Sequence, residues 1–431
     1  MIARLRHHFP ALASVAIRAA GVALGFLIVI IIGRTWGPEG SGVYGLVSQT
    51  AMFLGIVAVG GLDLAAVRAL SGINPATERL AGQSIVRLLV IMAGLAAIPV
   101  TLIVLFGNRA IALLIDEPLP VQALSALMAL LVARTMARMM SAILRAQRYF
   151  LLGQAMDAAL IPALFGAALL LLVGPSLDSL LYWMMVMAIA AILVGLAAII
   201  WVYLAARHSG RMPMAPALQS MAATALPLWG VTIALNFADW YGLTVVTSQL
   251  GLAEAGIYRV VMQFATVFSL LSTGLFGVYS VRIAAAQAQD EWAAVARLVR
   301  SATLLSAALV TIPAIILIIA AKPVLGIVGP EFQSGATALQ IGLVGQILYI
   351  ITGPAGLTLA MTGHARINLA ITMISTASLI VFAPLAASHY GTIGVVGCIS
   401  ALLVARNLAS LAFVRRQLGI NALSGRYHPP A

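Results

Sequence analysis

Arginines within long apolar segments are the residues of this sequence best suited to binding chemistry. Arg18 stands among small apolar residues with no acidic neighbour, and Arg134 and Arg138 are four residues apart, which places both on one face of a helix. A guanidinium binds phosphate through two parallel hydrogen bonds, and ionisable groups deep in a bilayer usually serve function. We therefore treat all three as candidate contacts for an anionic group. Two alternatives stay open: snorkelling of Arg18 to the interface, and arginine enrichment at a helix end for Arg134 and Arg138.

A second group joins polar and aromatic side chains in another apolar segment. Asn236 and Asp239 are three residues apart, on one helical face, and Trp240 follows directly. An aromatic ring beside polar groups suits a sugar, and the Asp239 carboxylate alternatively suits a coupling proton or sodium ion. Arg34 and Arg259 fall near helix ends, where they are candidates for contacting a substrate during release. The competing explanation is a structural ion pair of Asp239 with either arginine and an interfacial position for Trp240.

Signatures of enzymatic chemistry are missing from the sequence. It contains no GxxxxGK[ST] phosphate-binding loop and no HExxH metal motif. Its one cysteine, Cys398, allows neither an intramolecular disulfide nor a multi-cysteine metal site. We therefore predict that the protein is not an enzyme, has no catalytic residue or metal site, and needs no cofactor.

The composition predicts an all-α protein that crosses a membrane many times. Of 431 residues, 62% are hydrophobic and 8% are charged, against roughly 25% charged in soluble domains. A span needs about 20 apolar residues. Twelve segments meet this criterion, near 11–33, 43–65, 84–107, 119–142, 157–174, 180–205, 222–247, 258–281, 302–321, 337–360, 367–388 and 391–414.

Arginine placement predicts the orientation in the membrane. With the N-terminus in the cytoplasm, 19 of the 24 basic residues fall in cytoplasmic segments or at cytoplasmic helix ends, Arg406 among them. The outer side holds four, and Arg18 lies within the first span. This predicts two cytoplasmic termini. It also explains most of the net charge of +12 without nucleic-acid binding. A further cytoplasmic feature, at 282–301, has the pattern of an amphipathic helix on the membrane surface.

An internal repeat divides the chain. Residues 37–49 and 251–263 share a Gly-x₄-Gly-(Val/Ile)-Tyr-x₄-Gln pattern at an offset of 214 residues, and Glu117 matches Glu331 at the same offset. Six spans in each half leave both halves in the same orientation, as in transporters whose two lobes rock about a central cavity. We predict a six-helix lobe at 1–206, a cytoplasmic linker at 207–221, a second six-helix lobe at 222–416 and a cytoplasmic tail at 417–431.

Several of these turns resemble a known family. The segment Arg34–Gly45 resembles the turn between the first two helices of polysaccharide exporters of the Wzx type, in the multidrug/oligosaccharidyl-lipid/polysaccharide (MOP) superfamily. Residues 61–68 are similar to the end of that family's second helix, and 329–332 and 362–366 to its later loops. The resemblance extends over about 11–416. It rests on glycine turns and helix ends, so it indicates the superfamily better than the substrate.

The resemblance implies an alternating-access flippase. Its substrate would be a polyprenyl-pyrophosphate-linked oligosaccharide, moved across the bacterial inner membrane for surface polysaccharide synthesis. The implied partners are that lipid, the membrane lipids and a polysaccharide polymerase. The alternatives are a cation-coupled small-molecule exporter or a peptidoglycan-precursor flippase of the same superfamily. A major-facilitator transporter is a further alternative, although the loop 71–79 lacks that family's pattern. A membrane scaffold without transport activity also stays open.

Overall fold

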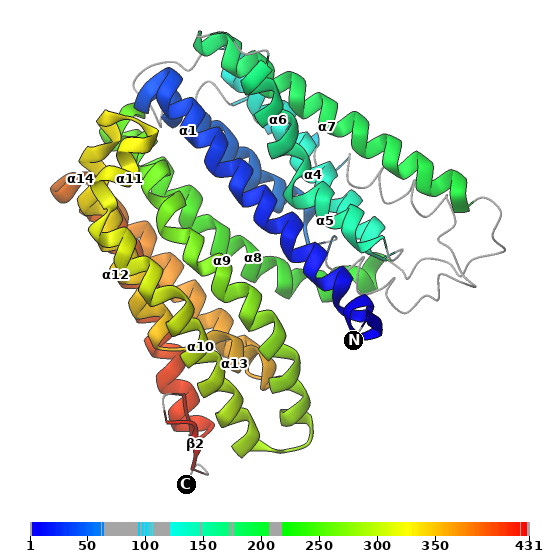
Figure 1. Cartoon of the computed structure of the whole chain (residues 1–431), viewed down its shortest axis with the longest axis vertical. Coiled ribbons are helices and arrows are strands. Elements are labelled where there is room, and N and C mark those ends of the chain that lie inside the picture. The colour runs from blue at the N-terminus through cyan, green and yellow to red at the C-terminus, as the bar shows by residue number, and fades with distance from the viewer. Residues whose placement is uncertain are drawn as a thin grey trace. The chain divides into compact units, whose positions relative to one another are not determined.

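The computed structural model confirms an all-α membrane fold (Figure 1). It describes residues 2–61, 63, scattered positions between 94 and 106, 121–146, 149–171, 174, 176–206, 218–422 and 424–428. The described elements are, in order, α1 (Ile2–Val59), α4 (Val121–Ala146), α5 (Phe150–Ala158), α6 (Leu160–Leu171), α7 (Leu177–Ala206), α8 (Leu218–Leu250), α9 (Leu252–Ala288), α10 (Trp292–Ile319), α11 (Ala321–Val328), the 3₁₀ helix η1 (Pro330–Gly335), α12 (Ala336–Ile351), α13 (Ala355–Met361), α14 (Ala365–Gln417), β1 (Ile420–Asn421) and β2 (Arg426–Tyr427).

Within these ranges, six helices are long and apolar enough to cross a membrane, or seven if the bent pair α5–α6 is one span. Two of the six contain a break at a glycine in left-handed backbone conformation: Gly37 in α1 (φ 63°) and Gly391 in α14 (φ 58°). Gly37 falls between the first two spans expected from the sequence, and Gly391 is the first residue of the twelfth. The third expected span lies mostly outside the described residues, as do Glu117 and most of the expected linker, so the count of twelve stays a prediction.

Contacts divide the chain into two compact units. Unit 1 comprises Met1–Trp36 and Val43–Asn236, and unit 2 comprises Gly37–Gly42 and Phe237–Ala431. The division runs through α8, whereas the sequence-based lobes divide before it. Compact units and repeat halves need not coincide, so the lobe boundaries stay a prediction.

The two glycine turns of the repeat lie against each other within unit 2. A Cβ atom on Gly42 would overlap the carbonyl oxygen of Leu252, and one on Gly256 would overlap that of Pro38. At the repeat offset, Pro38 corresponds to Leu252 and Gly42 to Gly256, so the two contacts are equivalent and reciprocal. Backbones can approach this closely only where side chains are absent. Gly42 and Gly256 therefore have a packing role, whereas the turns are formed at Gly37 and Gly251, which have positive φ.

The predicted surface helix at 282–301 is wrong. Instead, α9 continues to Ala288, and α10 begins at Trp292 after a tight turn in which Asp290 has a φ of 55°. The alanine-rich stretch therefore forms the tip of a helical hairpin (Figure 1). The amphipathic pattern arises because Val295, Ala296 and Val299 are buried in a hydrophobic cluster with residues from α14 and β1.

The end of the chain is folded onto this hairpin. The strands β1 and β2 pair antiparallel, and the Tyr427 ring stacks on Trp292 with centroids 6.3 Å apart. Ile420 is fully buried in the same cluster. Most of the segment expected as a tail is thus part of the packed end of unit 2.

Two helices are interrupted within the predicted spans. The axes of α5 and α6 differ in direction by 51° at Ala159. The tenth predicted span is divided into α12 and α13 at Gly353 and Pro354, where Gly353 has a φ of 81°. Proline lacks the amide hydrogen that an uninterrupted helix needs, which accounts for the second break.

The glycine contact gives a stability prediction. We expect Gly256→Ala to destabilise the protein by on the order of 1–3 kcal/mol, because the new methyl group meets a carbonyl that cannot move independently of its helix. Gly230→Ala in α8 is the matched control, since nothing lies within 4 Å of its Cβ position. Thermal unfolding in detergent, followed by circular dichroism, measures both. Equal melting temperatures for the two variants would contradict the packing role.

Candidate functional site in the helical units

Unit 2 contains a cluster of three charged residues on three helices. Asp239 lies on α8, Arg259 on α9 and Arg406 on α14, and the charges of both arginines act on the Asp239 carboxylate. The side chain of Asp239 is exposed, so a ligand or water can reach it. The formal charges of the three groups sum to +1.

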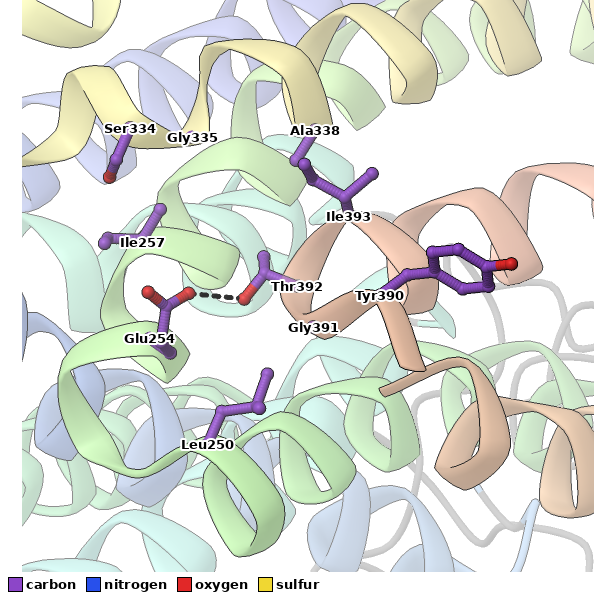
Figure 2. A pocket seen from close by; sticks show the side chains of 10 residues that line it. All are labelled: Leu250, Glu254, Ile257, Ser334, Gly335, Ala338, Tyr390, Gly391, Thr392 and Ile393. Carbon is purple, nitrogen blue, oxygen red and sulfur yellow. Dashed lines mark hydrogen bonds between the residues drawn. The ribbon is translucent and has the colours of Figure 1, made fainter. Parts of the chain in front are cut away.

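The cluster lies at the depth of a bilayer interior. Leu250 and Gly391 line one pocket (Figure 2), so the α8–α9 turn and the α14 break lie at the same end of unit 2. Counting about 1.5 Å per residue from those turns places Arg259, Asp239 and Arg406 at about 12, 17 and 22 Å. These depths fall within a hydrocarbon layer of about 30 Å, and the depth of Asp239 lies between those of the two arginines.

The break between α12 and α13 lies next to this cluster. The Asn407 amide nitrogen donates to the carbonyl oxygens of Tyr349 and Gly353 at 3.0 and 2.9 Å and to the Thr352 hydroxyl at 2.6 Å. Asn407 is buried, and the charge of the adjacent Arg406 acts on Tyr349. Interrupted helices with exposed backbone polar groups frequently form the binding sites of transporters. Here Asn407 satisfies the carbonyls that the break leaves without helical partners.

Aromatic rings extend along α8 beside Asp239. Tyr241 stacks on Phe237 with centroids 5.1 Å apart, and Trp240 lies 5.8 Å from the same ring. The Tyr241 hydroxyl donates to the carbonyl of Ile380 at 3.0 Å, which ties α8 to α14. Trp240 is therefore part of an aromatic cluster, and its part in sugar binding stays a prediction.

In unit 1, Arg134 lines a small internal cavity. The cavity, about 30 Å³, lies between α1, α4, α6 and α7, and its walls include Tyr44 and Phe165, whose rings stack at 5.7 Å. This volume holds about one water molecule. A phosphate group therefore cannot enter the cavity in this conformation. Contact of Arg134 with a substrate requires movement of the surrounding helices.

Arg138 has a carboxylate partner in the same unit. Its guanidinium lies 3.9 Å from the Asp63 carboxylate, and both side chains are partly buried. This ion pair supports a structural role for Arg138. Two turns further along α4, Arg145 donates to the Ser141 carbonyl at 3.2 Å, within its own helix. The three arginines along α4 therefore have different surroundings.

The remaining candidates lie on α1 and α8. Arg18 and Arg34 are both exposed, which leaves their side chains accessible to solvent, lipid or a ligand. Asn236 donates its amide to the Thr232 carbonyl of its own helix at 2.8 Å and belongs to unit 1. The structure thus brings together Asp239 and Arg259 of the predicted residues.

Two polar residues of this region were missed as candidates. The sequence favoured a cytoplasmic helix end for Arg406. In the structure Arg406 lies within α14, eleven residues before the helix ends at Gln417. Asn407 is the next residue in the chain. Their signal was an arginine and an asparagine side by side in an apolar segment. Because the positive-inside rule assigns such arginines to cytoplasmic helix ends, Arg406 was not predicted to be part of a site.

Comparison with known proteins supports the fold and leaves the family open. No protein-family model matches the chain, and no curated protein matches it. Among solved structures, a multidrug resistance MATE family transporter of the MOP superfamily, in an inward-facing conformation, matches with a TM-score of 0.74 at 15% identity, over 94% of this chain and 97% of that one. The lipid II flippase MurJ matches with a TM-score of 0.67 at 12% identity, over 94% and 87%.

A third similar structure is a MOP superfamily transporter from Pyrococcus furiosus. It matches with a TM-score of 0.59 at 16% identity, over 95% of this chain and 94% of that one. Its authors describe a binding pocket of reversed polarity that suggests a different function. At these identities the likeness establishes the fold: this chain has the fold of MOP superfamily transporters.

The charge cluster predicts a coupling between Asp239 and Arg406. We expect Asp239→Asn to lower the melting temperature, because it removes the carboxylate on which both arginine charges act. Adding Arg406→Gln should restore part of the loss, with a coupling energy of roughly 0.5–3 kcal/mol in a double-mutant cycle. The matched control is Asp178→Asn, an exposed acid in the first turn of α7. Strict additivity of the two changes would contradict the cluster.

Proposed function

We propose that this protein is a flippase that moves a polyprenyl-pyrophosphate-linked oligosaccharide across a membrane by alternating access. The observation that carries the proposal is the positive charge of both helical units at membrane depth. In unit 2 two arginines act on the single carboxylate of Asp239. In unit 1 Arg18, Arg134 and Arg138 lie within predicted spans, and Arg138 lies 3.9 Å from the Asp63 carboxylate.

An anionic head group fits this charge better than a cation does. Two charges 4 Å apart interact by about 4 kcal/mol at an effective dielectric constant near 20. A cation approaching Asp239 would meet two arginine charges against one carboxylate. A pyrophosphate instead offers several oxygens that guanidinium groups bind bidentately. In the mechanism we infer, arginines hold the pyrophosphate while the polyprenyl tail stays in the lipid.

The second candidate is a cation-coupled small-molecule exporter. The multidrug transporter in the comparison matches with a higher TM-score than the flippase, 0.74 against 0.67. Asp239 is exposed and could bind a proton or sodium ion if its arginines moved away. Because of the charge balance at Asp239, we rank the cation-coupled exporter second. A peptidoglycan-precursor flippase shares the lipid pyrophosphate chemistry, and the assay below distinguishes it by the lipid that accumulates.

The proposal extends to location and partners. We place the protein in a bacterial inner membrane with both termini in the cytoplasm, on the basis of arginine distribution. Membrane lipids would surround both units. Polysaccharide polymerase machinery would take up the product on the far side. Removal of the product on the far side, an ion gradient or the membrane potential would supply the energy, in keeping with the absence of an ATP-binding motif from the sequence.

The test uses a deletion strain that carries variants of this protein. We expect Arg18→Ala combined with Arg134→Ala to reduce surface polysaccharide by roughly 10-fold or more, because each charge-assisted contact to phosphate contributes about 1.5–3 kcal/mol. Lipid-linked oligosaccharide should accumulate in the cytoplasmic leaflet. Arg415→Ala, an exposed arginine in the last turn of α14, is the control and should behave as the wild type.

Two outcomes would contradict the proposal. One is full polysaccharide synthesis by the double variant, with membrane levels equal to the wild type, which would remove both arginines from the mechanism. The other is accumulation of peptidoglycan precursor in place of the oligosaccharide, which would reassign the substrate. Increased drug sensitivity of an Asp239→Asn strain, with normal polysaccharide, would favour the exporter.

A further inference from the structure

A pocket of about 340 Å³ opens at the end of unit 2, apart from the charge cluster (Figure 2). Three parts of the chain form it: the α8–α9 turn, the junction of η1 with α12, and the break in α14. Its volume is at the lower end of the range for small-molecule sites. Its ten lining residues are all in unit 2.

The polar part of the pocket is a carboxylate held by a hydroxyl. Thr392 donates its hydroxyl to Glu254 Oε2 at 2.6 Å, and the two side chains face each other across the pocket (Figure 2). An ionised carboxylate has about four lone-pair sites. The Thr392 bond uses one of them and fixes the orientation of the group. Glu254 is the only acidic or basic side chain among the lining residues.

The rest of the lining is largely apolar. Leu250, Ile257, Ala338 and Ile393 provide aliphatic surface around the carboxylate (Figure 2). A site with one fixed negative charge and aliphatic walls is complementary to a small cation that carries alkyl groups. We propose that this pocket binds a small organic ammonium ion, with its nitrogen at Glu254 and its alkyl groups against these side chains.

Other ligand classes fit the lining less well. A metal ion such as Ca²⁺ takes six to eight oxygen ligands, and no group of three or more His, Cys, Asp or Glu that could hold a metal occurs in the part of the chain that the structure describes. A sugar needs several free hydroxyl partners and a ring to stack on. The Ser334 hydroxyl donates to the Glu331 carbonyl, and the Tyr390 ring points away from the pocket (Figure 2). An anion would meet the charge of Glu254.

The pocket also joins segments that turn at glycines of positive φ. Gly391, which lines it, has a φ of 58°, and Gly251, next to Leu250, has a φ of 87°. An occupant therefore touches α8, α9 and α14 at their turns. Binding to the folded state alone raises the melting temperature with ligand concentration. The inference does not depend on which substrate the protein transports.

The test measures binding of tetraethylammonium to the purified full-length protein in detergent, by calorimetry and by thermal shift. We expect saturable binding to the wild type and a loss of affinity of about tenfold or more in Glu254→Gln, equal to about 1.4 kcal/mol. The amide can still accept the Thr392 hydrogen bond, so the variant keeps the local geometry. Glu331→Gln removes a neighbouring exposed charge outside the pocket and should bind as the wild type.

A second variant tests the pocket without changing the charge of Glu254, so that an effect of Glu254→Gln on folding can be recognised. Ile393→Phe fills the pocket from a partly exposed position and should weaken binding while Glu254 stays in place. Unchanged affinity in both variants would overturn the proposal, since binding would then occur elsewhere. Binding of glucose or sodium in place of tetraethylammonium, or no binding at all, would also overturn it.

Discussion

The close approach of two glycine turns is the constraint on which unit 2 depends. Gly42 lies against the Leu252 carbonyl and Gly256 against that of Pro38. The first turn of α9 is fixed by this contact, because neither backbone can shift without overlap. The starting point of α9 in turn sets the depth of Arg259, which lies two turns further along the helix. The depth of Arg259 in the membrane therefore depends on the absence of side chains at Gly42 and Gly256.

A second constraint is the cost of charge in a low-dielectric interior. Two carboxylates have a described charged partner, and in both cases it is arginine: Asp63 lies near Arg138, and Asp239 near two arginines. Removing one partner of such a pair leaves an uncompensated charge, which destabilises the fold. Among the charged residues of the predicted spans, arginines outnumber carboxylates in both units, which leaves a net positive formal charge. It is the property that we connect with an anionic substrate.

The sequence predicted the class of fold well because apolar segment length is a direct physical requirement of a membrane. It also identified both repeat glycines, Gly42 and Gly256, each of which packs against the backbone of the other's turn. It failed at 282–301, since a helical hairpin and a surface helix share the same amphipathic period. It missed the role of Arg406, because depth along α14 depends on where the helix breaks, at Gly391. Side-chain partners such as Thr392 for Glu254 join distant segments and leave no local pattern.

Reconstitution into vesicles tests the central claim most directly. The purified protein is placed in liposomes that contain a fluorescently labelled polyprenyl-pyrophosphate-linked oligosaccharide, and exposure of the label to an external quencher is followed with time. Our account predicts rapid exposure of label from the inner leaflet in protein-containing vesicles, but not in empty ones. It also predicts no uptake of an organic cation such as ethidium under an ion gradient. Transport of ethidium with no movement of the labelled lipid would contradict the account.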